Sequence, residues 1–213
     1  MQKVREFGQV DCYHGVVYIA SKPEPRAGLR TVFLDRDGVL NVKMPEGHYV
    51  MRWDEFHALP GAAAAIRMLN DLGVRVIVVS NQRGIALGLY TAEDVKAIHS
   101  AFQGFLLSQG AHVDAFYFCP HNRVECLCRK PLTGMFDEAM AEFPTIDAQT
   151  SLMVGDSRSD MEFGRRLGMK TAFIDSQSDD RESDAKEARQ LADFCFTSLY
   201  ECICELRTAL AAF

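Results

Sequence analysis

Apolar positions along the chain follow two different repeat patterns. Short runs dense in β-branched and aromatic residues predict strands, and stretches with apolar residues every three or four positions predict helices. The predicted strands cover residues 31–35, 74–80, 113–119, 151–156 and 170–175. The predicted helices cover residues 60–73, 91–110, 133–143 and 159–168. Strands that alternate with helices in this way predict an α/β fold, a parallel sheet with helices on both faces.

Residues typical of helix ends support these boundaries. Gly73, Gly110 and Gly168 each follow a predicted helix, where a C-terminal cap is expected. Thr91 stands where an N-cap is expected, with Asp94 at the third helical position.

The two ends of the chain do not repeat this unit. Residues 1–30 are rich in proline near their end and predict an N-terminal extension of unknown role, with a possible hairpin near residues 16–20. Residues 175–189 are acidic and predict an exposed loop that leads into a short helix, and residues 193–212 predict a final strand and helix. Residues 31–213 are therefore expected to form one domain.

Composition excludes several classes of protein. The chain has 23 basic and 29 acidic residues, a formal net charge of −6, and no basic block, which argues against nucleic acid as a partner. No apolar run reaches the roughly 20 residues that span a membrane, and the first ten residues lack the apolar core of a signal peptide. The seven cysteines are an odd number for a secreted disulfide framework. A cytoplasmic protein is expected.

Carboxylates follow two of the predicted strands. Asp35 and Asp37 come directly after the first strand and before Gly38, and Asp156 and Asp160 come at the end of the fourth. Charge at the end of a buried strand is costly unless a cation offsets it. Adjacent strands would bring Asp35, Asp37 and Asp156 together, and three oxygen ligands suit Mg²⁺.

The same strand ends offer the groups that phosphoryl transfer needs. Asp35 is the candidate nucleophile and Asp37 the candidate acid and base. Ser80 and Asn81 end the second strand and can donate hydrogen bonds to phosphate oxygens, while Lys130 can supply positive charge. Each short motif alone is also typical of an ordinary turn or strand end.

Four motifs in order, D-R-D-G, S-N-Q, R-K-P and G-D-S-R-S-D, resemble those of the haloacid dehalogenase (HAD) superfamily over residues 31–196. The resemblance implies a Rossmann-like core and a Mg²⁺ cofactor. It assigns phosphoryl or metal roles to Asp35, Asp37, Ser80, Lys130 and Asp156.

A cluster of possible soft metal ligands precedes Lys130. Cys119, His121, Cys126 and Cys128 lie within ten residues, and four such ligands predict a closed, structural Zn²⁺ site. This site would order the loop that carries Lys130. The alternative is a group of free thiols beside an exposed histidine.

The sequence C-P-H followed by C-x-C-R-K-P resembles the zinc-bearing branch that contains heptose bisphosphate phosphatases and histidinol-phosphate phosphatases. This resemblance implies a minimal cap and a small phosphorylated metabolite as substrate. The expected substrate is D-glycero-D-manno-heptose 1,7-bisphosphate, from which the 7-phosphate is removed, or a related sugar phosphate, and the alternative is histidinol phosphate. The implied substrate contacts are Asn81, Gln82, Arg83, Arg129, Glu46, His48 and Tyr49.

One position departs from the heptose enzymes. Ser157 stands where they have a lysine, and whether Ser157 or Arg158 takes over its phosphate contact is open. A catalytically idle binding module is the alternative of another class, but such a module would be expected to lose Asp35, Asp37 or Lys130. Enzymes with a small cap are often monomers, which is the state expected here.

Overall fold

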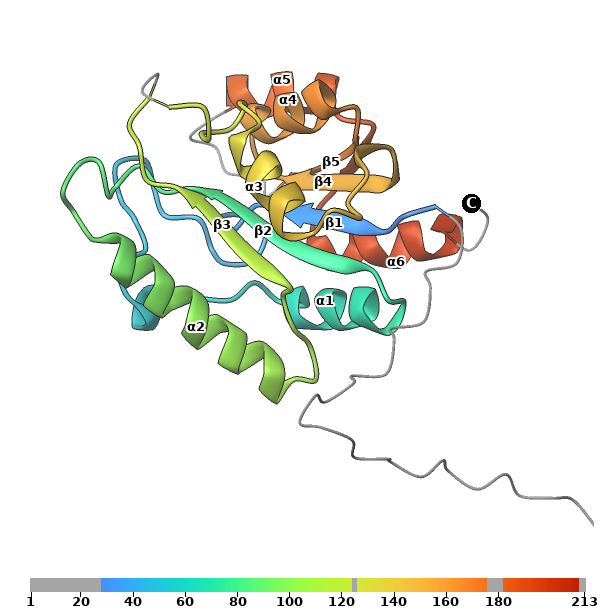
Figure 1. Cartoon of the computed structure of the whole chain (residues 1–213), viewed down its shortest axis with the longest axis horizontal. Helices are drawn as coiled ribbons and strands as arrows, with labels where there is room; N and C mark the ends of the chain where they lie inside the picture. Colours follow the sequence, from blue (N-terminus) through green and yellow to red (C-terminus); the bar gives the residue numbers. More distant parts are fainter. Residues whose placement is uncertain (1–27, 124–125, 176–181, 211–213) are drawn as a thin grey trace, which may run out of the picture.

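The computed structural model describes residues 28–123, 126–175 and 182–210 (Figure 1). The predicted extension over residues 1–30, with its possible hairpin, lies outside the described residues except for residues 28–30.

Six parallel strands form one sheet in the order β3-β2-β1-β4-β5-β6. Their bounds are Thr31–Leu34 (β1), Arg75–Asn81 (β2), Ala115–Cys119 (β3), Ser151–Gly155 (β4), Lys170–Ile174 (β5) and Phe194–Phe196 (β6). The five strands predicted from apolar runs and the final strand are confirmed. Strand β1 lies between β2 and β4, with Leu34 paired to Val78 and Val154, so the sequence-distant ends of β1 and β4 are neighbours.

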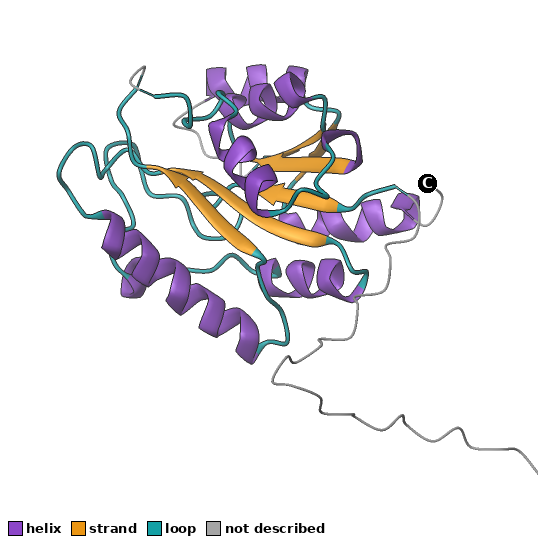
Figure 2. Cartoon of the chain, in the orientation of Figure 1, coloured by secondary structure: helices purple, strands orange, loops and turns teal. Residues whose placement is uncertain are grey.

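Helices cover both faces of the sheet, as predicted (Figure 2). One face carries α1 (Ala62–Asp71), α2 (Ala92–Ser108) and α6 (Leu199–Leu210), and the other carries α3 (Gly134–Glu142), α4 (Arg158–Leu167) and α5 (Glu182–Leu191). Two short 3-10 helices, η1 (Trp53–Glu55) and η2 (Ala148–Thr150), lie in connections. Thr91 is the N-cap of α2, as predicted, and it forms a capping box with Asp94.

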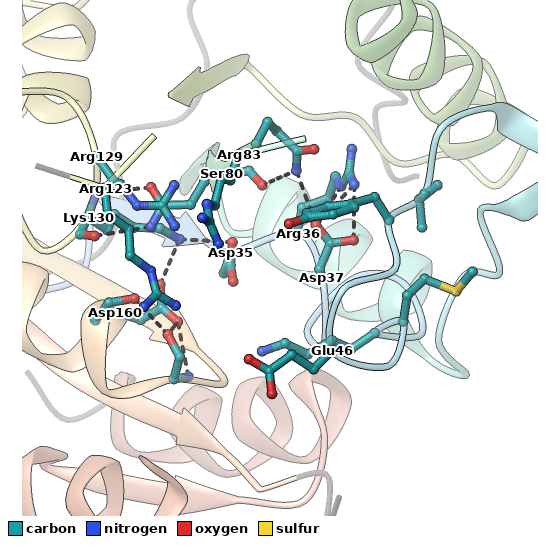
Figure 3. A pocket seen from close by; sticks show the side chains of 18 of the residues that line it. Asp35, Arg36, Asp37, Glu46, Ser80, Arg83, Arg123, Arg129, Lys130 and Asp160 are labelled. Carbon is teal, nitrogen blue, oxygen red and sulfur yellow. Dashed lines mark hydrogen bonds and ion pairs between the residues drawn. The ribbon is translucent and has the colours of Figure 1, made fainter. Parts of the chain in front are cut away.

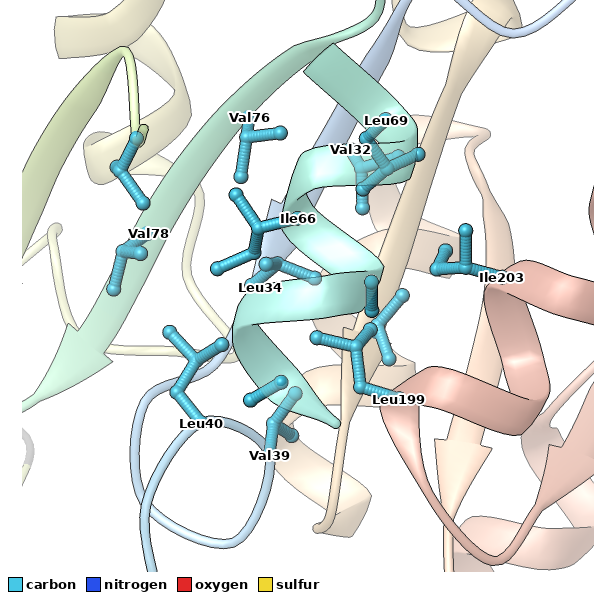
Figure 4. Close-up of a cluster of buried hydrophobic side chains, with 14 of the residues drawn as sticks. Val32, Leu34, Val39, Leu40, Ile66, Leu69, Val76, Val78, Leu199 and Ile203 are labelled. Atoms are coloured by element: carbon cyan, nitrogen blue, oxygen red, sulfur yellow. The ribbon is translucent and has the colours of Figure 1, made fainter. Parts of the chain in front are cut away.

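Strand β1 is buried on both sides. Val32 and Leu34 point into the cluster that contains Ile66 of α1 and Ile203 of α6 (Figure 4), whereas Phe33 points into the opposite cluster. Each fully buried side chain of this size contributes roughly 1.5–3 kcal/mol. The packing on both faces therefore holds the carboxyl end of β1, where Asp35 begins the next segment, in one place.

Candidate active site

The ends of β1 and β4 bring two acidic segments into contact. The backbone N–H of Asp35 donates to the carbonyl of Val154 over 2.9 Å. Gly38 has φ +93°, and a Cβ there would lie 2.1 Å from Oδ2 of Asp156. Only glycine allows both this backbone conformation and this close approach. The turn after β1 is thus shaped to receive the Asp156 carboxylate.

Three carboxylates gather at this edge of the sheet. Oxygens of Asp35, Asp156 and Asp160 all lie within 4.8 Å of one another. Asp160 is fully buried, and its Oδ2 accepts hydrogen bonds from the backbone N–H and the hydroxyl of Ser157. Lys130, also buried, places Nζ 2.8 Å from Asp35 Oδ1 and 2.6 Å from Asp160 Oδ1 (Figure 3). The Lys130 ammonium therefore forms ion pairs with two of the three carboxylates.

The charge balance of this cluster raises the pKa of Asp35 to about 7. Burial is the main cause, the Lys130 ammonium opposes it, and the nearby carboxylates of Asp160 and Asp156 add to it. The pKa of Lys130 is also raised, because its two carboxylate partners outweigh the effect of burial. An additional cation would stabilise the ionised form of Asp35.

Asp37 lies outside this carboxylate group, which differs from the predicted set of Asp35, Asp37 and Asp156. Its carboxylate accepts hydrogen bonds from Arg36 at 3.0 and 3.2 Å, from Asn41 at 2.9 Å and from Gln82 at 3.1 Å. Burial acts to raise the pKa of Asp37, but the Arg36 charge and these hydrogen bonds lower it overall. These donors hold the Asp37 carboxylate beside Gln82, which follows β2, and away from the group that contains Asp156.

Asn81 and Gln82 hold other site residues in place. The Asn81 amide donates to the Lys130 carbonyl over 3.1 Å and accepts from the Lys130 N–H over 3.0 Å. Gln82 is buried, donates to Ser80 Oγ as well as to Asp37, and accepts from the Tyr90 hydroxyl. Both are predicted substrate contacts and line the cleft, and their side chains are hydrogen-bonded to protein groups.

A cleft of about 810 Å³ opens over these residues. The segment between β1 and α1 lines the cleft directly. Its only helix within the described residues is the short η1, so the cap over the cleft is minimal, as predicted. The cleft lining includes Asp35, Asp37, Ser80, Lys130 and the predicted substrate contacts Glu46, His48, Tyr49, Asn81, Gln82, Arg83 and Arg129.

The predicted soft ligands also meet. Cys119, His121, Cys126 and Cys128 have ligand atoms within 4.8 Å of one another. Their neighbouring separations are 3.4 Å for Cys119–Cys126 and Cys126–Cys128, 3.2 Å for His121–Cys128 and 3.7 Å for Cys119–His121. Ligands about 2.3 Å from a tetrahedral Zn²⁺ lie about 3.8 Å apart, so the four atoms fit such an ion after a small expansion.

Reasoning from the sequence missed several residues of the site. Arg36, which stands inside the D-R-D-G motif but was given no role, and Tyr90, which lies outside the four motifs, contribute through buried contacts. Asp160 was named as an acid after the fourth strand, but it was given no role. The S-x-x-D spacing of Ser157 and Asp160 is that of a capping box, which the structure contains at the start of α4. Lys43, whose Nζ contacts Asp156, comes from a segment more than 100 residues away in sequence.

Comparisons with known proteins agree with this geometry. A family model described as HAD-hydrolase-like matches residues 127–202. A D-glycero-alpha-D-manno-heptose-1,7-bisphosphate 7-phosphatase of Mycobacterium tuberculosis is 38% identical over 171 residues, covering 80% of this chain and 87% of that protein. The chain belongs to the heptose bisphosphate phosphatase family of HAD-like hydrolases. It is therefore a phosphatase.

Two further matches support this family. A D-glycero-beta-D-manno-heptose-1,7-bisphosphate 7-phosphatase of Rhodopseudomonas palustris is 40% identical over 145 residues, covering 64% of this chain and 78% of that protein. The crystal structure of a D,D-heptose 1,7-bisphosphate phosphatase from B. bronchiseptica, complexed with magnesium and phosphate, superposes with a TM-score of 0.73 at 28% identity, covering 85% of this chain and 99% of that one. Within the described residues, no helix is long and apolar enough to span a bilayer.

Proposed function

We propose that this phosphatase is Mg²⁺-dependent and removes the 7-phosphate of D-glycero-D-manno-heptose 1,7-bisphosphate through an aspartyl-phosphate intermediate. The observation that carries the proposal is the position of Asp35. It lies at the buried end of β1, faces the cleft, and has the Lys130 ammonium 2.8 Å away. The names of the relatives support the substrate, and they include enzymes named for each anomer.

In this mechanism Asp35 attacks phosphorus, and the P–O bond to the sugar breaks. Lys130 neutralises charge on Asp35 and on the phosphoryl oxygens, and Ser80, whose hydroxyl lines the same cleft, donates a hydrogen bond to one of those oxygens. Water then cleaves the aspartyl-phosphate and releases inorganic phosphate, which regenerates the Asp35 carboxylate.

Asp37 is the proposed acid and base. Arg36, Asn41 and Gln82 favour its carboxylate form, which is the form that accepts a proton from the attacking water in the second step. To donate a proton to the leaving oxygen in the first step, Asp37 must first take one up. The negative charge of a bound phosphate favours that uptake.

Both proposed metals suit the side chains available. Asp35 and Asp156 are the proposed Mg²⁺ ligands, because carboxylate oxygens suit this ion and the two residues directly follow the paired strands β1 and β4. Asp37 remains a proposed third ligand, although its carboxylate is held by other donors. Bound Mg²⁺ would supply positive charge to the phosphoryl oxygens. The thiol and imidazole cluster is the proposed structural Zn²⁺ site.

Several broader proposals accompany this function. Residues 31–213 would form one catalytic domain that acts as a monomer on a small phosphorylated metabolite, without nucleic acid or membrane partners. A cytoplasmic location is supported by the cysteines that the structure describes, none of which forms a disulfide.

The test is phosphate release from a panel that contains both anomers of heptose 1,7-bisphosphate, other sugar phosphates and histidinol phosphate, with Mg²⁺ present. Asp35→Asn should lower kcat at least about 10³-fold. Asp175→Asn is the matched control, because Asp175 follows β5 and is not among the residues that line the cleft. Preference for histidinol phosphate would replace the proposed substrate, and full activity of Asp35→Asn would refute the proposed nucleophile.

A further inference from the structure

Lys43 extends from a well-anchored backbone at the rim of the cleft. The carbonyl of the nearby Asn41 accepts from the Gly38 N–H over 2.8 Å, and the Val42 N–H donates to the His57 carbonyl over 2.8 Å. Lys43 lines the cleft, and its side chain is 22% exposed. The base of this side chain is therefore held in place while its ammonium borders the substrate space.

The ammonium of Lys43 contacts both oxygens of Asp156, with Nζ 2.7 Å from Oδ1 and 2.5 Å from Oδ2. The Asp156 side chain is only 4% exposed. An ammonium that bridges both carboxylate oxygens uses lone pairs that a metal ion also needs. Lys43 and a divalent cation at Asp156 therefore compete for the same ligand.

Residues beside Asp156 in sequence do not supply this positive charge. The Ser157 hydroxyl donates to Asp160 over 2.6 Å and caps α4. Arg158 directs its guanidinium to Glu162 of α4 and to Glu187 of α5. Lys43 therefore provides a lysine at this carboxylate, from the opposite side of the cleft, whereas position 157 provides none.

The net charge of the cluster depends on Lys43. Three carboxylates, Asp35, Asp156 and Asp160, face the ammoniums of Lys43 and Lys130. Ionised side chains therefore carry a net charge of about −1, and about −2 if Lys43 is neutralised. Loss of this ammonium should strengthen the binding of a divalent cation and weaken the binding of a phosphate dianion.

We propose that Lys43 is a substrate-binding residue that exchanges partners. Its ammonium neutralises Asp156 when no divalent cation is bound, and turns to a phosphate oxygen of the substrate when Asp156 binds the cation. The inference rests on the proposed function, because it takes Asp156 as a metal ligand. It adds a specificity residue from the segment between β1 and α1.

The test compares Lys43→Met, which keeps the length but removes the charge, with Lys43→Arg, which keeps the charge. Mn²⁺ binding to the full chain without substrate is measured by electron paramagnetic resonance, and KM is measured separately. Lys43→Met should bind Mn²⁺ about tenfold more tightly and raise KM about tenfold, whereas Lys43→Arg should retain most substrate affinity. Lys96→Met, which removes an exposed lysine of α2 outside the cleft lining, should change neither value.

An unchanged or weaker Mn²⁺ affinity in Lys43→Met, with Mn²⁺ binding abolished by Asp156→Asn, would overturn the role of Lys43 and leave the proposed metal site intact. Mn²⁺ binding that Asp156→Asn does not alter would overturn both. Lys43→Gln and thermal denaturation of each variant distinguish these effects from misfolding.

Discussion

The two candidate metal sites are built over very different distances along the chain. The thiol and imidazole cluster takes all its ligands from residues 119–128, so one loop can form it. The carboxylate cluster combines Asp35 with Asp156 and Asp160, which meet only because β1 pairs with β4. The first site depends on local spacing, whereas the second depends on the assembled sheet.

The two sites meet at Lys130. The backbone N–H of Arg129 donates to Cys126 Sγ over 3.4 Å, and the next residue is the lysine that contacts Asp35 and Asp160. The comparison therefore indicates a division of roles. In the proposed arrangement, the local cluster orders a loop when it binds Zn²⁺, and that loop places the Lys130 ammonium in the carboxylate cluster at the sheet edge.

The largest expected effect concerns the free energy of unfolding that the chain loses when the buried Asp35 carboxylate is ionised. The pKa of folded Asp35 is about 7 against an ordinary value of 3.8, so the folded chain keeps a proton that the unfolded chain loses. Without added divalent cations, the free energy of unfolding should fall as pH rises from about 4 to about 7. Asp35→Asn removes the titrating carboxylate, so its free energy of unfolding should fall less than that of wild type over this pH range, by on the order of a few kcal/mol.

Urea unfolding at pH 5 and pH 8 measures this difference. Asp175→Asn is again the control. Its free energy of unfolding should change between pH 5 and pH 8 as that of wild type does. If Asp35→Asn and wild type lose stability in parallel between these pH values, the charge cost assigned to Asp35 is wrong.

The next effect tests the local site. Cys126→Ala should remove bound zinc and lower kcat/KM about 10- to 100-fold, because the loop no longer holds Lys130. Mn²⁺ binding at the carboxylate cluster should persist, since its ligands come from other segments. Metal analysis and steady-state kinetics measure these outcomes.

Cys204→Ala is the matched control, because Cys204 is half-buried in α6 and lies outside the cluster. It should keep both zinc and activity. Wild-type protein purified without zinc would contradict the prediction.

The smallest effect tests the link between the sites. Asn81→Ala removes two hydrogen bonds to the Lys130 backbone, each worth about 1 kcal/mol, and should lower kcat about tenfold. Asn70→Ala removes a comparable bond to the His112 N–H outside the site, and should lower stability without lowering kcat. Equal kcat values for the two variants would show that Asn81 does not position Lys130.

Sequence reasoning was most successful where the signal was local. The apolar runs predicted the ends of β1 and β4 to within one residue of Leu34 and Gly155, and the cysteine and histidine cluster followed from spacing. Period-two alternation cannot report side-chain direction beyond a strand, so the turn toward Arg36 and Gln82 at Asp37 was not predictable. The contact between Lys43 and Asp156 joins two segments whose proximity depends on the whole sheet.

Asp160 belongs at once to the N-terminal cap of α4 and to the ion pair of Lys130. Selection for heat resistance and selection for turnover therefore act on the same carboxylate. A substitution of Asp160 that serves one property also changes the other. A library that randomises this helix start to improve the cap would also alter catalysis. Engineers who seek a more durable variant would do better to change α2 or α6, whose ends lie away from this shared residue.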